Sequence, residues 1–90
     1  MKRASSAAAA VSAILLTAPF AFAGQDVKLG DLPQPARETV QREVGNGKIT
    51  DIDREEKRGS VYYEVEFTAA NRDYEIDVAP DGKLLRRVDD

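Results

Sequence analysis

Two stretches near the C-terminus alternate apolar and polar residues, and the second nearly repeats the first. Tyr63-Glu-Val-Glu-Phe67 and Tyr74-Glu-Ile-Asp-Val78 each place an apolar side chain at every second position. This period of two is typical of β-strands that bury one face and expose the other. With similar flanking segments, the pattern predicts four strands, at about residues 48–56, 61–68, 72–79 and 83–88.

Short turn sequences separate these predicted strands. Gly59 follows Lys57-Arg58, Ala70-Asn71 offers an Asn that tolerates the left-handed region, and Pro80-Asp81-Gly82 suits a tight turn. Because such connections cannot cross over a sheet, neighbouring strands should be antiparallel. The sequence therefore predicts a four-stranded antiparallel meander.

The turn at Ala70-Asn71 predicts the pairing of the two repeated stretches. If these residues form the loop, three apolar pairs share one face: Phe67 with Tyr74, Val65 with Ile76, and Tyr63 with Val78. The same register places two acidic pairs on the other face: Glu66 with Glu75, and Glu64 with Asp77. One face is therefore expected to join the core while the other meets water.

The outer two strands are harder to pair. Pairing Ala79 with Lys83 predicts that Leu84 lies beside Val78, Val88 lies beside Tyr74, and Arg87 points outward against Glu75. In the first strand, Ile49 and Ile52 are an odd number of residues apart, so regular alternation would point them to opposite faces of the sheet. They share a face only if the strand contains a bulge. The register of that strand stays open at this point.

A helix is predicted ahead of the strands, from about residue 33 to residue 44. Apolar residues recur every four positions along it, at Leu32, Ala36, Val40 and Val44. Pro33 and Pro35 suit a first turn, and Gly45-Asn46-Gly47 suits its end. The fold class is therefore α+β, with one N-terminal helix packed on a four-stranded antiparallel meander.

The first 23 residues have the features of a signal peptide. A basic start at Lys2-Arg3 precedes an apolar run, and Ala21-Phe22-Ala23 matches a cleavage site. An uncleaved membrane anchor is disfavoured, because the run is short and rich in Ala. We expect cleavage after Ala23, a periplasmic or secreted protein without a stable membrane span, a polar lead-in at 24–31 and one α+β domain at 32–90.

Charge and composition narrow the function. Cleavage removes two basic residues, so the net charge changes from -3 to -5, with 11 basic against 16 acidic residues. An acidic domain does not suit nucleic acid, which requires a basic face. The chain contains no His and no Cys, and Ser60 lies in a predicted turn beside Gly59 without a visible base or oxyanion site. We therefore expect no enzyme activity, no catalytic residue and no cofactor.

The acidic positions admit three interpretations. They could be the solvated outer face of a sheet, a surface for a basic partner, or a cation site with Asp51 and Asp53 adjoining it. Calcium is coordinated by six to eight converging oxygens, and no segment of the sequence resembles a calcium-binding loop, so we assign no metal ligands. Tyr62 is expected on the same face of the sheet as the acids and could anchor a partner. The candidate partner surface comprises Tyr62, Glu64, Glu66, Glu75, Asp77 and Arg87.

The order of these segments resembles the PepSY-like domains, a group likened to β-lactamase-inhibitor proteins. The resemblance covers about residues 32–88 and depends on fold positions rather than chemical ones: Gly45, Gly47, Ile49, Tyr63, Val65, Phe67, Tyr74, Ile76, Val78, Gly82 and Lys83. Ala79 stands where PepSY modules often carry Asp, so no role of that acid is carried over.

The resemblance implies an exported non-enzymatic module that binds or inhibits other proteins, such as peptidases. We therefore expect an unidentified protein partner, either basic or a peptidase, and a monomer or a weak homodimer through the sheet edges. An acidic cation-binding or stress-related envelope protein is the alternative.

Overall fold

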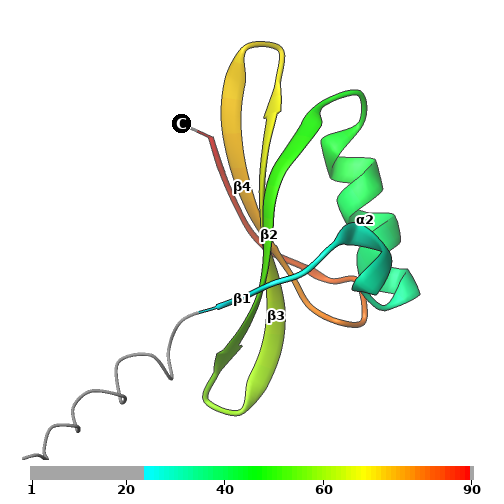
Figure 1. Cartoon of the computed structure of the whole chain (residues 1–90), viewed down its shortest axis with the longest axis vertical. Helices are drawn as coiled ribbons and strands as arrows, with labels where there is room; N and C mark the ends of the chain where they lie inside the picture. The colour runs from blue at the N-terminus through cyan, green and yellow to red at the C-terminus, as the bar shows by residue number, and fades with distance from the viewer. Residues whose placement is uncertain (1–23, 90) are drawn as a thin grey trace, which may run out of the picture.

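The computed structural model describes residues 24–89 (Figure 1). The predicted signal peptide at 1–23 lies outside the described residues. Within them, one α-helix, α2 (Gln34–Val44), packs on one face of an antiparallel sheet. The α+β class predicted from the sequence is confirmed.

The sheet has five strands rather than the predicted four. In the order β1-β2-β3-β4-β5 they are β1 (Gln25–Asp26), β2 (Lys48–Lys57), β3 (Ser60–Ala69), β4 (Arg72–Val78) and β5 (Leu84–Asp89). The additional strand β1 lies in the segment expected to be a polar lead-in. It pairs with β2 at Arg54 and Asp53, and the Val27 N–H then donates to the Ile52 carbonyl at 3.0 Å. Two paired residues are too few to show a hydrophobic period, so the pattern did not reveal this strand.

After β1, a 3₁₀-helix, η2 (Leu29–Asp31), leads the chain to α2. Pro35 lies in the first turn of α2, where a missing N–H breaks no helical hydrogen bond. Gly45 ends the helix with a positive φ of 57°. The helix buries Ala36, Thr39, Val40 and Val44 against the sheet, so the predicted four-residue period does form the packing face.

The pairing of β3 with β4 matches the predicted register at every position. The three predicted apolar pairs lie on the helix side, and Glu66–Glu75 and Glu64–Asp77 lie opposite each other on the other side. The resulting core contains Leu32, Ala36, Val40, Val44, Ile52, Tyr63, Val65, Phe67, Ile76 and Val78.

A bulge in β2 settles the register that the sequence left open. Ile49 pairs with Phe67 and Asp51 with Glu66, so Thr50 is an extra residue on β2. Beyond it, Ile52 pairs with Val65. Both isoleucines therefore face the helix, which regular alternation would have prevented.

A second bulge, in β5, overturns part of the predicted last hairpin. Val78 pairs with Leu84 as predicted, but Asp77 pairs with Arg86, so Leu85 is an extra residue. Beyond this point each residue of β5 points to the face opposite the predicted one, and Arg87 lies opposite Ile76 on the helix side. The prediction that Arg87 faces Glu75 is wrong, and so is the pairing of Val88 with Tyr74, because Val88 pairs with Glu75.

Arg87 instead joins β5 to the helix. Its Nη1 donates to Glu43 Oε1 at 2.6 Å, and its guanidinium carbon lies 4.9 Å from the centre of the Tyr74 ring. Tyr74 in turn stacks on Phe67, with ring centres 5.1 Å apart. These contacts cover the rim of the core with a cation rather than with apolar atoms.

No helix among residues 24–89 has the length and apolar character needed to cross a membrane.

The turn between β4 and β5 also holds the helix in place. Thr39 is buried and its hydroxyl donates to the Gly82 carbonyl at 2.6 Å. Gly82 has a positive φ of 94°, and a β-carbon there would lie 2.8 Å from the Pro35 carbonyl oxygen. This position therefore requires glycine for both its conformation and its contact with α2.

We predict that Gly82→Ala lowers the free energy of unfolding by about 1–3 kcal/mol, because it strains the backbone and pushes the turn away from α2. Gly30→Ala is the matched control, since a β-carbon at Gly30 meets nothing within 4 Å. Chemical denaturation of both variants measures the difference. Equal stability of the two variants would contradict this account of the turn.

Candidate interaction surface

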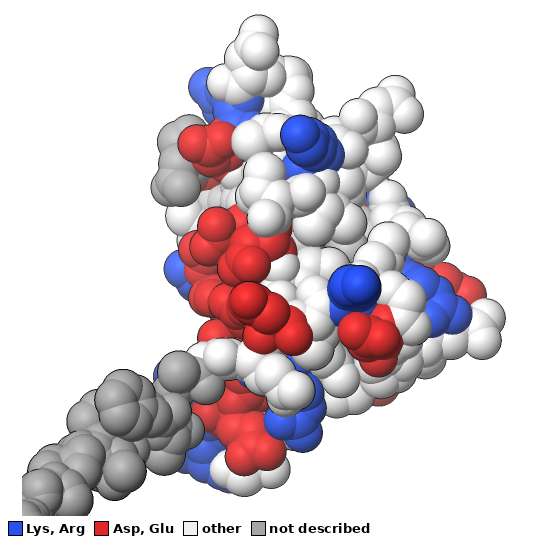
Figure 2. Space-filling view, viewed as in Figure 1, with Lys and Arg blue, Asp and Glu red and all other residues white. Residues whose placement is uncertain are grey.

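Carboxylates gather on the sheet face that points away from α2. We call this set the acidic face; strand register assigns to it Asp26, Asp51, Asp53, Glu55, Glu64, Glu66, Asp73, Glu75 and Asp77. Figure 2 shows a band of acidic side chains over the sheet, on the side away from the helix. Four neighbouring strands contribute to it, which is why residues far apart in the sequence meet there.

The acids are arranged in rows that cross the strands. One row runs from Asp26 through Asp53, Glu64 and Asp77 to Arg86 at the β5 edge. Directly opposed residues in antiparallel strands have β-carbons only about 4.5–5.5 Å apart. Each acid in the row therefore neighbours another, and the sole cation in the row stands at one end.

Most of the predicted partner surface is brought together on this face. Tyr62, Glu64 and Glu66 of β3 lie beside Glu75 and Asp77 of β4. Arg87 does not join them, because the β5 bulge turns it to the helix side. Its neighbour Arg86 takes that place, a residue that regular alternation assigns to the core side.

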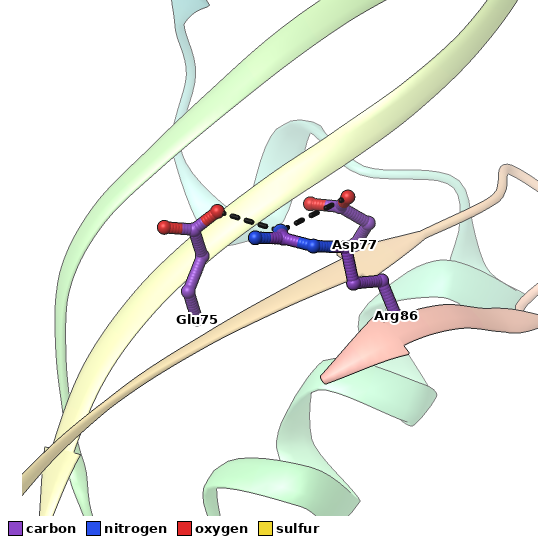
Figure 3. A network of polar contacts seen from close by, with 3 residues as sticks. All are labelled: Glu75, Asp77 and Arg86. Carbon is purple, nitrogen blue, oxygen red and sulfur yellow. Dashed lines mark hydrogen bonds and ion pairs between the residues drawn. The ribbon is translucent and has the colours of Figure 1, made fainter. Parts of the chain in front are cut away.

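Arg86 bridges two of the acids (Figure 3). Its Nη1 lies 2.8 Å from Glu75 Oε2 and 3.4 Å from Asp77 Oδ2. The hydrogen bond from Arg86 lowers the pKa of the Glu75 carboxyl. For Asp77, burial is the larger effect and raises the pKa despite the nearby guanidinium. Among the described residues, Asp77 Oδ1 is a buried oxygen that lacks a hydrogen-bond partner.

Two acids farther along the face titrate far from their ordinary values. Burial, a hydrogen bond with Glu75 and the surrounding negative charges raise the pKa of Glu64 from 4.5 to about 7. A hydrogen bond with Asp26, then burial and the charge of Asp51, raise the pKa of Asp53 from 3.8 to about 7. Near neutral pH these carboxyl groups therefore hold their charge at a free-energy cost.

Tyr62 stands at the end of the acidic face, where its ring is half-buried and directly opposite Glu55. Burial, followed by the charges of Asp77, Glu55 and Glu64, raises the pKa of its hydroxyl. The hydroxyl is therefore neutral across the physiological pH range and can donate a hydrogen bond. An aromatic ring with a polar tip next to acids suits contact with a polar partner.

Three sets of carboxylates lie close enough to share a cation. Within each set, one oxygen per residue lies within 4.8 Å of the others: Asp26, Asp51 and Asp53; Asp53, Glu55 and Glu64; Glu64, Glu75 and Asp77. Calcium requires six to eight oxygens, so water would supply most of its ligands at any of these sets. The surface can attract cations, whether ions or the side chains of a protein.

Ser60, the one serine after the predicted cleavage site, lies at the exposed start of β3. It is directly opposite Lys57, which is exposed as well. Water solvates both side chains, so neither is held in the fixed geometry that an activated serine requires. The arrangement gives no support to nucleophilic chemistry at Ser60.

We predict that the protein is more stable at about pH 5.5 than at about pH 8. Asp53 and Glu64 bind protons more tightly in the folded chain than in the unfolded chain. Raising the pH from their ordinary values through about 7 therefore lowers the free energy of unfolding. Glu75 acts in the opposite sense: the stability it contributes is lost as the pH falls below its ordinary value of 4.5, which limits the optimum on the acid side.

Melting temperatures across this pH range measure the effect. The variant Asp53→Asn/Glu64→Gln should lose most of the decline between about pH 5.5 and pH 8. Glu38→Gln/Glu56→Gln, which changes two exposed acids outside the acidic face, should retain it. A decline of the same size in both variants would show that the crowded acids are not its source.

Comparisons with protein-family models, with curated protein sequences and with solved structures found no match for this chain. The resemblance to PepSY-like domains stays a prediction from the sequence pattern.

Proposed function

We propose that this protein is an exported, non-catalytic binding module that holds a basic protein against its acidic face. The single observation that carries the proposal is the row Asp26–Asp53–Glu64–Asp77, in which adjacent carboxylates face one another across neighbouring strands. Export depends on the predicted signal peptide. The PepSY-like resemblance favours a module that binds or inhibits proteins such as peptidases.

Crowding of like charges on the acidic face has a free-energy cost that a basic partner can relieve. Like charges directly opposite each other on a sheet destabilise it by roughly 0.2–1 kcal/mol per pair. Arg86 relieves this repulsion at Glu75 and Asp77 but leaves Glu64 and Asp53 with strongly raised pKa values. Positive charge brought by a partner would favour the ionised forms of these acids, and that gain would add to the binding free energy.

The shape of the surface also favours a protein partner. The acidic face spreads over β1 to β4, and no other element of the described residues encloses it (Figures 1 and 2). Small-molecule sites are usually concave and enclose most of their ligand. An open sheet face with a charge of one sign instead suits a protein surface of the opposite charge, and it also accelerates the encounter.

A crosslinking pull-down from the native host tests the proposal. The variant Asp53→Asn/Glu64→Gln/Glu66→Gln removes three carboxylates from the acidic face with little change in shape. We expect it to recover several-fold less of the basic proteins that the unchanged protein enriches. Mass spectrometry of the crosslinked fraction gives the ratio.

The matched control for the pull-down is Glu38→Gln/Glu56→Gln/Asp89→Asn, which removes three exposed acids that do not belong to the acidic face. It should recover the same partners as the unchanged protein. If both triple variants recover equal amounts, the acidic face is not the binding surface. Circular dichroism confirms beforehand that both variants fold.

Divalent cation binding is the second candidate, favoured by the three sets of converging carboxylates. A ligand that binds only the folded state raises the melting temperature as its concentration exceeds its dissociation constant. Calcium should therefore raise the melting temperature of the unchanged protein but not that of Asp53→Asn/Glu64→Gln/Glu66→Gln. A melting temperature that stays constant up to about millimolar calcium, the range of weak extracellular sites, would eliminate this candidate.

A further inference from the structure

The start of β3 has an open edge. Pairing between β3 and β4 begins at Tyr63 and Val78, whereas β3 itself begins at Ser60. Residues 60–62 therefore pair with β2 on one side and, within residues 24–89, with no strand on the other. Pro80, next to this edge, has no N–H to donate, and the turn that follows leads the chain away.

A groove of about 810 Å³ runs beside this open edge. Its apolar lining comes from three separate parts of the chain: Val61 and Tyr62 of β3, Ala79 and Pro80 after β4, and Leu85 of β5. Leu85 is 49% exposed and is one of two large hydrophobic side chains exposed among the described residues. Leu85 is the extra residue of the β5 bulge.

The groove leads directly onto the acidic face. Asp77 belongs to both, and its buried Oδ1 has no hydrogen-bond partner among the described residues. Tyr62 lines the groove and lies between Glu55 and the end of β4. Lys57 and Arg58 lie toward the hairpin tip, so negative charge increases from that tip toward the middle of the sheet.

We propose that the groove takes an extended segment of the basic partner as a short added strand along residues 60–62. A large apolar side chain of this segment packs between Tyr62 and Leu85, and Lys or Arg residues two positions away, on the same side of the segment, extend over Glu55, Glu64 and Asp77. Strand addition suits an open edge, since main-chain hydrogen bonds give affinity and side-chain pockets give specificity. The proposal rests on the proposed function and specifies which part of the partner binds.

Charge complementarity identifies the occupant. A neutral apolar segment could fill the groove but would gain nothing from the acids beside it, whereas a segment with a basic residue two positions from its apolar residue satisfies both. In an extended segment, alternate side chains point to opposite sides, with successive residues about 3.3 Å apart. Because Tyr62 lies on the acidic face, an apolar residue packed against it and basic residues two positions away from that residue point to the same face.

Two synthetic peptides of equal charge test this. The probe is acetyl-Lys-Thr-Phe-Thr-Lys-amide, and the control replaces Phe by Ser. With the full chain labelled with ¹⁵N, the apolar peptide should bind roughly tenfold more tightly than the control, because burying one aromatic side chain contributes that much even in an open groove. Amide shifts should concentrate at residues 60–62 and at Leu85.

Leu85→Ser and Leu84→Ser form a matched pair, since both leucines are exposed on β5 but only Leu85 lines the groove. Leu85→Ser should reduce the affinity for the apolar peptide to that of the Ser control, and Leu84→Ser should leave it unchanged. N-methylation of alternate peptide amides should also weaken binding, because it removes the donors needed for strand addition.

The failures are distinguishable. The groove proposal is overturned if both peptides bind with equal affinity, if that affinity falls with added salt, and if Leu85→Ser does not change it. In that case the proposal for the acidic face still stands. If neither peptide binds and the pull-down does not depend on the acidic face, both proposals fail. If sedimentation shows concentration-dependent dimers that Leu85→Ser dissolves, the groove joins two copies of this chain, and the partner segment proposed here is excluded.

Discussion

A single helix covers a single face of the sheet, and the rest of the structure depends on this one-sided burial. Val65, Phe67, Ile76 and Val78 are almost completely buried under α2, whereas no element of the described residues covers the opposite face. Every strand must therefore alternate, with apolar residues toward the helix and polar residues away from it. The repeated Tyr-x-Val/Ile-x-Phe/Val pattern of β3 and β4 follows from that requirement, and so does the accumulation of acids on the other face.

The same constraint explains which parts of the fold could be predicted from the sequence. The helix, the β3–β4 register and the paired acids all follow from regular alternation. The β2 bulge left a sign, because Ile49 and Ile52 could not otherwise face the helix together. The β5 bulge left no such sign in the sequence, because the strand places one arginine on the helix side with the bulge or without it. Which arginine takes that place depends on contacts with Glu43 and Tyr74, and these residues become neighbours only in the folded chain. The two-residue strand β1 was too short to carry any period.

The β5 bulge has the larger consequence for function. It brings Arg86 between Glu75 and Asp77 and turns Arg87 toward the helix, and its extra residue, Leu85, lines the groove beside the open strand edge. Arg86 thereby neutralises part of the negative charge at one corner of the acidic face, whereas the carboxylates along the rest of the face stay crowded. The surface combines uncompensated charge with an adjacent apolar groove, the combination of polar rim and apolar anchor found in protein-binding sites.

The central claim is that the acids of this face are held together at a cost that a cationic partner relieves. A carboxyl NMR titration of Glu64, alone and with saturating pentalysine, tests it most directly. The account predicts a pKa of about 7 for Glu64 in the free protein, and a fall toward its ordinary value of 4.5 when pentalysine binds. A Glu64 that titrates near 4.5 in the free protein, or one whose pKa does not change when pentalysine binds, would contradict the account.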